Sequence, residues 1–275
     1  MSTRSLFDPL VDAYDAARPS YPDRLFKDLE WLAGRELAGA DILEVGAGTG
    51  IATRALLVRG ARVIPVDHSS GMLGRLRERT PGIAAVRADG EALPFSDAVA
   101  GLVCYAQAWH WVRVPVAAAE AARVLRPGGA LALWWNDVDG EDLRWWERQQ
   151  QRLEAMSPGY RRAYRTRPWS DELRWTGLFT EVVTVSGRWS RTLPLDRYEL
   201  WLRSKSYVQA IGDRLEDFLD AERRSLLKVF PDGMVTEPFH TVLVVARLPP
   251  NSRSATIRGP LADGLAAGVG LPIIQ

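Results

Sequence analysis

Residues 41–50 have the sequence DILEVGAGTG, in which a short apolar run ends in three glycines spaced two residues apart. Glycine lets the backbone turn tightly, and it lets a ligand approach because no Cβ stands in the way. The spacing G-x-G-x-G lacks the third-glycine offset of the dinucleotide-binding pattern G-x-G-x-x-G. The stretch therefore predicts a strand, a ligand-binding turn and a helix, and it argues against a nicotinamide dinucleotide as the ligand.

Further apolar runs follow in the first half of the chain, at residues 62–67, 98–105 and 130–135. Continuous apolar runs of this length are typical of parallel strands that are buried on both faces. Helical patterns lie between them, at residues 49–59, 71–79 and 116–125. Strands that alternate with helices predict a doubly wound α/β sheet with right-handed connections.

The second half is rich in arginine and tryptophan and has a different pattern, with helix-like stretches and two further strands at 181–185 and 239–246. We expect one domain of residues 1–248, whose sheet carries helical insertions at about 137–176 and 195–232. Insertions of this kind lie beside the carboxyl ends of the strands, where ligands bind, and often form lids. Residues 249–275 show no periodicity and are expected to form a loose tail.

Composition excludes several classes of protein. The chain has 275 residues with 35 basic and 34 acidic side chains, so its net charge of +1 argues against a nucleic-acid partner, which needs a strongly basic face. One cysteine and three scattered histidines leave no zinc site by spacing and no internal disulfide. No signal-peptide core and no apolar run of about 18 residues are present. We expect a cytoplasmic protein without a bound metal or a membrane partner.

Acidic residues stand at the ends of three successive predicted strands. Glu44 precedes the glycine turn, Asp67 follows Gly50 by 17 residues, and Asp89 follows a short third strand at residues 86–88 and precedes Gly90. A carboxylate in the position of Asp67 can accept hydrogen bonds from both hydroxyls of a ribose. Together the three acids suit a ribose, an amino group and a positive centre rather than a chain of phosphates.

Residues 41–50, 67, 89–94 and 127–129 resemble the motif set of the class I S-adenosylmethionine (SAM)-dependent methyltransferases. Residues 14–22 and 106–111 resemble, more narrowly, the small-molecule branch of type 11 methyltransferases that includes the trans-aconitate methyltransferases. The resemblance implies SAM as the cofactor and a Rossmann-like, mostly parallel seven-stranded sheet whose last strand is antiparallel. It implies cofactor contacts from Tyr14, Glu44, Gly46, Gly48, Gly50, Asp67, Met72, Asp89 and Gly90.

Candidates for the chemistry follow the fourth predicted strand, at the edge where ligands gather. We expect Gln107 to bind the cofactor or the substrate, Trp109 to stack on the acceptor, and His110 to act as a base or a hydrogen-bond donor. A general base is needed only if the nucleophile loses a proton near the transition state. The alternative is that this aromatic loop simply packs against the insertion.

Residues 201–207 resemble the segment of the family that faces the acceptor. On this basis we assign Arg203 and Ser204 to substrate binding and Tyr207, with His110, to catalysis. The whole pattern predicts a methyltransferase that acts on a small molecule, at a carboxylate or hydroxyl oxygen, as a monomer or homodimer. Alternatives are methylation at nitrogen or carbon, a SAM-binding protein without activity, and, least favoured, a nicotinamide-dependent oxidoreductase.

Overall fold

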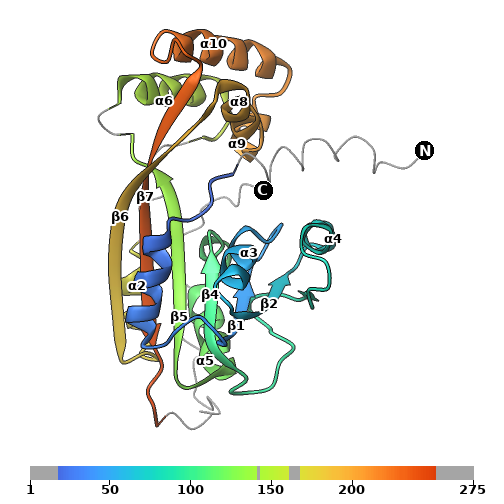
Figure 1. Ribbon diagram of the computed structural model, residues 1–275, viewed down its shortest axis with the longest axis vertical. Coiled ribbons are helices and arrows are strands. Elements are labelled where there is room, and N and C mark those ends of the chain that lie inside the picture. Colours follow the sequence, from blue (N-terminus) through green and yellow to red (C-terminus); the bar gives the residue numbers. More distant parts are fainter. Residues whose placement is uncertain (1–17, 141–142, 161–167, 252–275) are drawn as a thin grey trace, which may run out of the picture.

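The structure is a computed structural model that describes residues 18–140, 143–160 and 168–251. Seven strands form one sheet, in the order β3-β2-β1-β4-β5-β7-β6 (Figure 1). Their bounds are β1 Asp41–Val45, β2 Arg62–Asp67, β3 Val86–Arg87, β4 Ala100–Ala106, β5 Leu125–Val138, β6 Glu181–Pro194 and β7 Met234–Arg247. The first five strands are parallel and β7 is antiparallel to both of its neighbours. The predicted doubly wound sheet with an antiparallel last strand is confirmed.

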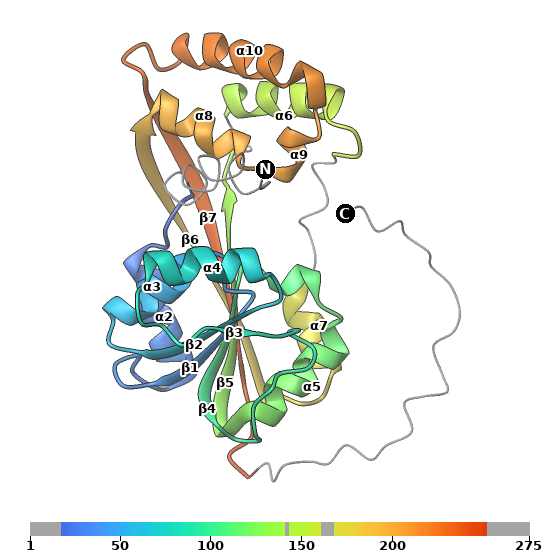
Figure 2. The ribbon, with the colours of Figure 1, turned by 90° about the vertical axis from the view of Figure 1, so that its right-hand side faces the viewer.

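Helices cover both faces of this sheet (Figure 2). One face packs against α2 (Asp23–Ala33) and α3 (Ile51–Val58), and the other against α5 (Val114–Val124) and α7 (Trp169–Trp175). α2 was not predicted from the sequence. Its signal was present, because the helix buries an apolar stripe of Leu25, Phe26, Leu29 and Ala33.

Three strands are much longer than the rest and carry a second layer of structure. β5, β6 and β7 have 14 residues each, and β6 and β7 stay paired from Glu181↔Arg247 to Pro194↔Met234. Beyond the other strands they support a group of helices that we call the cap (Figure 1). The cap consists of α6 (Arg144–Met156), α8 (Leu195–Arg203), α9 (Ser206–Gln209), the short 3-10 helix η4 (Gly212–Arg214) and α10 (Leu215–Leu227).

The cap has its own apolar core, which includes Trp145, Leu153, Tyr198 and Phe218. Only part of the first predicted insertion, 137–176, contributes to it. α6 belongs to the cap, whereas α7 buries Leu173 in the core beneath the sheet. The second predicted insertion, 195–232, lies entirely within the cap.

The helices are short and amphipathic. α6 and α10, with 13 residues each, are the longest of those described, and each buries one stripe of side chains. α4 (Ser70–Arg79) has ten residues and buries Leu73 and Leu76. In the described parts of the chain, no helix combines the length and apolar character needed to cross a membrane.

Candidate functional site

The glycine turn lies at the carboxyl edge of the sheet, where β1 separates β2 from β4. This is the point at which the strand order changes direction, and open α/β sheets bind their ligands there. The backbone N–H groups of Gly46 and Ala47 both donate to the carbonyl of Val66, at 2.8 and 3.0 Å. The turn is therefore tied to the end of β2 before it enters α3.

The glycines of the turn serve different purposes. Gly46 has a φ of +73°, and a Cβ built on it would lie 2.4 Å from the Cβ of Ala108 in the loop after β4. Gly48 has a φ of +56°, and a Cβ there would meet nothing within 4 Å. Gly46 thus allows two loops to pack closely, while Gly48 leaves open space beside the backbone. Gly50 begins α3 in a left-handed conformation.

Asp67 lies at the end of β2 and holds the turn from the other side. Its Oδ2 accepts the N–H of Gly48 and its Oδ1 accepts the N–H of Ser69, both at 2.8 Å. Each oxygen of a carboxylate can accept a second hydrogen bond, so acceptor positions remain for the hydroxyls of a ligand. Ser69 also caps α4 by accepting the N–H of Met72, which places Met72 in the first helical turn after Asp67.

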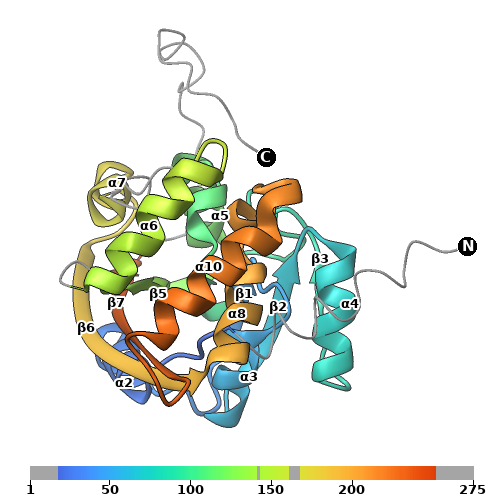
Figure 3. The same cartoon turned by 90° about the horizontal axis from the view of Figure 1, so that it is seen from above.

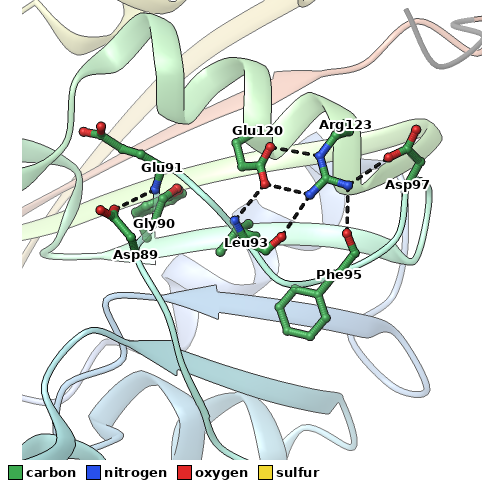
Figure 4. Close-up of polar contacts among 9 residues, drawn as sticks. Asp89, Gly90, Glu91, Leu93, Phe95, Asp97, Glu120 and Arg123 are labelled. Atoms are coloured by element: carbon green, nitrogen blue, oxygen red, sulfur yellow. Dashed lines mark hydrogen bonds and ion pairs between the residues drawn. The ribbon is translucent and has the colours of Figure 1, made fainter. Parts of the chain in front are cut away.

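Asp89 and Gly90 form the third part of this edge (Figure 4). Asp89 is exposed, and its Oδ1 accepts the N–H of Glu91 at 2.9 Å. A Cβ on Gly90 would lie 2.9 Å from Val45 Cγ1, and the Gly90 carbonyl accepts the hydroxyl of Tyr105 at 3.2 Å. The loop after β3 is therefore packed directly onto β1 and β4.

Two residues of α5 that the sequence analysis missed hold this loop (Figure 4). Glu120 accepts the N–H of Leu93 at 2.7 Å, and Arg123 donates to the carbonyls of Leu93 and Phe95 at 3.0 and 2.7 Å. The Arg123 guanidinium also lowers the pKa of Glu120 below its usual range. An acid and an arginine three residues apart on a predicted helix were the available signal, but their partners are distant in sequence.

Glu44 supports the turn from beneath. Its side chain is 1% exposed, and Thr53 of α3 donates a hydrogen bond to it at 2.5 Å. Burial raises the pKa of Glu44 to about 8, partly offset by the hydrogen bond from Thr53. The carboxyl group is thus enclosed under the loop rather than presented on its surface.

Gln107 turns the chain after β4 in an uncommon backbone conformation. Its φ of +60° is in the left-handed region, which costs energy for a residue with a Cβ and often marks functional sites. Its N–H donates to the carbonyl of Trp134 at 2.9 Å, and its side-chain amide donates to the carbonyl of Asn136 at 3.2 Å. These bonds fasten the turn to β5, and no sequence signal announced the positive φ.

The short helix η2 (Trp109–Trp111) follows, and the surroundings of Trp109 favour the alternative of packing over stacking on an acceptor. Trp109 is wholly buried in the sheet core, and its ring packs edge-on against Tyr105 with a centroid distance of 4.6 Å. Packing in the core therefore accounts for the position of the Trp109 side chain. His110 is exposed, and the indole N–H of Trp135 lies 3.5 Å from its Nδ1.

The cap residues expected to contact the substrate lie together where α8 ends. Both terminal guanidinium nitrogens of Arg203 bind Glu216, at 2.7 and 2.5 Å, and this pairing raises the pKa of Arg203. The hydroxyl of Ser204 donates to the carbonyl of Trp201 at 2.7 Å and closes the helix. Both side chains thus have structural partners within the cap.

Tyr207 lies in α9, immediately after these residues. Its half-buried ring lies 4.7 Å from that of Tyr160, and its carbonyl accepts the hydroxyl of Ser157 at 2.5 Å. Tyr14, the remaining predicted cofactor contact, lies outside the described residues. The structure therefore gathers the predicted site residues into two groups, one at the carboxyl edge of the sheet and one on the cap.

The edge of the sheet fits SAM. The open space at Gly48 admits a ligand against bare backbone, and the acceptor-only carboxylates of Asp67 and Asp89 match the hydroxyls of a ribose and the amino group of an adenine. The same carboxylates would repel a pyrophosphate. These hydrogen-bond acceptors thus agree with the ligand that the sequence predicted.

Comparison with known proteins gives the same assignment. A family model described as a methyltransferase domain matches residues 43–133. An uncharacterized methyltransferase of Mycobacterium tuberculosis is 43% identical over 139 residues, which cover 50% of this chain and 55% of that protein. An uncharacterized methyltransferase-like protein of Schizosaccharomyces pombe is 29% identical over 229 residues, which cover 80% and 85% of the two chains. The match with the mycobacterial relative spans only about half of that protein's length.

Among solved structures, a protein of Anaeromyxobacter dehalogenans described as a type II methyltransferase superposes with a TM-score of 0.62. The two chains are 27% identical, and the match covers 84% of this chain and 99% of the other. The strand order, the glycine turn and these relatives agree. The chain therefore contains a methyltransferase domain at residues 43–133, and its fold and relatives support SAM as the cofactor.

Proposed function

We propose that the protein transfers a methyl group from SAM to a small-molecule acceptor that binds between the glycine turn and the cap. The observation that carries this proposal is the position of the cap, which stands on β5, β6 and β7 beyond the carboxyl edge of the sheet (Figure 2). A second wall opposite a cofactor site allows a reaction to be enclosed and water to be excluded.

On the sheet side, each residue has a defined task in this proposal. Asp67 would accept hydrogen bonds from the ribose hydroxyls, Asp89 would accept one from the adenine amino group, and Met72 would pack beside the adenine. Gly46 and Gly48 let the backbone pass under the methionine part. The bound cofactor supplies a methyl group on a positively charged sulfur. Because the displacement is in-line, these residues contribute mainly by fixing its direction.

On the acceptor side, His110 and Tyr207 are the candidates for contact with the nucleophile. His110 is exposed and able to accept or donate a proton, and Tyr207 presents a hydroxyl from the cap. Arg203 and Ser204, at the end of α8, are the candidates for binding the rest of the acceptor. A carboxylate acceptor would need orientation alone, whereas a hydroxyl acceptor would also need His110 as a base.

Oxygen is the proposed nucleophile. A malonyl-[acyl-carrier protein] O-methyltransferase of Halorhodospira halophila is 37% identical over 137 residues, 46% of this chain. A demethylmenaquinone methyltransferase of Clavibacter sepedonicus is 34% identical over 136 residues. The first name supports transfer to oxygen. The second name does not state the atom that is methylated, so methylation at nitrogen or carbon stays the alternative.

The test begins with calorimetry, in which SAM, S-adenosylhomocysteine and NAD are titrated separately into the purified protein. We expect binding of the two sulfur ligands and none of NAD. Release of S-adenosylhomocysteine is then followed with panels of carboxylic acids, phenols and amines. Turnover with acids or phenols supports the proposal. Turnover with amines alone would show that the methyl group is transferred to nitrogen and not to oxygen. SAM binding without any turnover would favour a SAM-binding protein without activity.

A further inference from the structure

A groove of about 550 Å³ lies between α6 and α10 of the cap. These two helices cross the end of the cap that is farthest from the sheet (Figures 1 and 3). Four of the side chains that line the groove are cationic. Arg148 and Arg152 come from α6, Arg224 comes from α10, and Lys228 follows the end of α10. The groove is therefore distinct from the methyl-transfer site in both position and chemistry.

Three of these cations lack a counterion within the described structure. Arg148, Arg224 and Lys228 are exposed and form no ion pair with a described residue, whereas Arg152 binds the buried Glu222. Many other surface arginines of the chain are paired, as Arg203 is with Glu216. Like charges that face one another across a groove repel, and an anionic occupant relieves this repulsion.

The occupant must also offer apolar surface. Leu227 lines the groove with 41% of its surface exposed. Ala221, one helical turn before Arg224, adds a second apolar side chain to the lining. A free anion such as phosphate would leave these apolar groups in water. An occupant with acidic and apolar side chains on one face would match both features.

The dimensions favour a helix as that occupant. The lining residues run from Arg148 to Arg152 on α6 and from Ala221 to Lys228 along the end of α10, so the walls are about one and two helical turns long. A groove between two helices can receive a third, whose side chains at i, i+3, i+4 and i+7 meet the walls. We propose that the groove between α6 and α10 is a docking site for an acidic amphipathic helix of a partner protein.

The test measures binding of a fluorescein-labelled peptide of about 15 residues, the length at which isolated helices become stable. One face of the peptide carries glutamate and leucine. The double variant Arg148→Glu/Arg224→Glu is compared with Lys27→Glu/Arg197→Glu, which reverses two exposed cations outside the groove and gives the same change in net charge. Fluorescence anisotropy should show a loss of affinity of about tenfold or more for the first variant and less than about twofold for the control.

A second measurement locates the peptide. Because Cys104 is the single cysteine and is buried, Ser225→Cys introduces one accessible thiol at the groove. An environment-sensitive dye there should respond to the peptide, and the same dye at Ser96→Cys, an exposed position in the loop between β3 and β4, should not. Equal affinity of both double variants would overturn the proposal. Equally tight binding of unstructured polyglutamate or tripolyphosphate would also overturn it, since the groove would then select charge alone.

Discussion

The carboxylate of Asp67 accepts the backbone N–H of Gly48 at 2.8 Å, so the end of β2 holds the glycine turn in place. Its other oxygen accepts the N–H of Ser69, which starts α4. One side chain thus positions the turn and the helix on either side of the proposed ribose position. The shape of the cofactor site depends on this residue even before a ligand is bound.

Asp67→Ala should weaken SAM binding by about 10- to 100-fold, because hydrogen bonds to a charged group contribute about 1.5–3 kcal/mol each. Calorimetry with SAM and S-adenosylhomocysteine measures the change. Asp232→Ala is the matched control, since Asp232 accepts a backbone N–H in an exposed turn of the cap. If a folded Asp67→Ala protein bound SAM with unchanged affinity, the cofactor would not bind at this edge of the sheet.

Gly46→Ala and Gly48→Ala should separate folding from binding. Both glycines have positive φ, so each substitution costs about 1–2 kcal/mol of stability. Gly46→Ala also forces a Cβ to within 2.4 Å of Ala108 and should cost a further 1–3 kcal/mol, roughly. Gly48→Ala should remain folded but bind SAM poorly, because its methyl group enters the open space.

Urea unfolding and calorimetry on the same preparations distinguish the two effects. Ala108→Gly should restore part of the stability lost in Gly46→Ala, since it removes the colliding methyl group. The same change should not help Gly48→Ala. Equal stability losses for the two single variants would contradict the packing role of Gly46.

Trp109→Ala should lower the free energy of unfolding by about 3–5 kcal/mol, because the side chain is wholly buried against Tyr105. Urea denaturation measures the loss, and Trp175→Ala, which truncates a tryptophan that is 78% exposed, is the control. If the variant kept its stability but lost acceptor binding, the result would show that Trp109 contacts the acceptor.

Glu44 should make stability depend on pH. Its folded pKa of about 8 lies above its usual value of 4.5, so between these values the folded state holds a proton that the unfolded state has released. Stability from this group is therefore fully present below about pH 4.5 and is lost as the pH rises towards 8. Glu44→Gln should flatten the decline, which urea titrations at pH 5 and 8 (about the two ends of the range) would reveal.

Glu91→Gln provides a control of opposite sign. The pKa of Glu91 is lowered by its hydrogen bond with Arg113, so its contribution is present at neutral pH and is lost as the pH falls. A Glu44→Gln protein with the same pH dependence as the parent would show that the buried carboxyl group does not titrate in this range.

Tyr207→Ala should lower kcat/KM for the acceptor by about 10- to 100-fold through loss of positioning, with SAM affinity unchanged. The comparison with Tyr207→Phe isolates the hydroxyl group. If both variants lose activity equally, the hydroxyl group is what matters. If only Tyr207→Ala loses activity, the ring is what matters, and the tyrosine is a positioning residue. Full activity in both would exclude α9 from the acceptor site.

The sheet was predictable wherever strands are buried on both faces. The runs at 41–45 and 62–67 coincide with β1 and β2, because continuous apolar sequence has few other structural explanations. The outer parts of β6 and β7 were not found. Residues such as Arg188, Ser190 and Arg191 lie on β6 beyond the covered sheet, where half of the side chains face solvent and the apolar signal disappears.

The site was predictable where short motifs determine the backbone. The glycine turn and Asp67 are adjacent because they end neighbouring strands, and strand order follows from connection rules. Contacts across long separations were not accessible in this way. Arg123 reaches the loop at residues 93–97 from α5, and Arg203 is fixed by Glu216, so sequence proximity to a motif gave no information about either partner.

The long β5–β7–β6 ribbon means that the chain passes between the sheet and the cap at only a few places: after Val138, between Met156 and Trp169, after Pro194 and before Met234. Under the proposed function, substrate choice in the cap and cofactor use on the sheet thereby become separable modules within one polypeptide. Grafting the segments beyond these crossings from a relative would exchange the acceptor wall without altering the strand register below. New acceptor specificities could then evolve by replacement of whole helices, while the nucleotide-binding half stays unchanged.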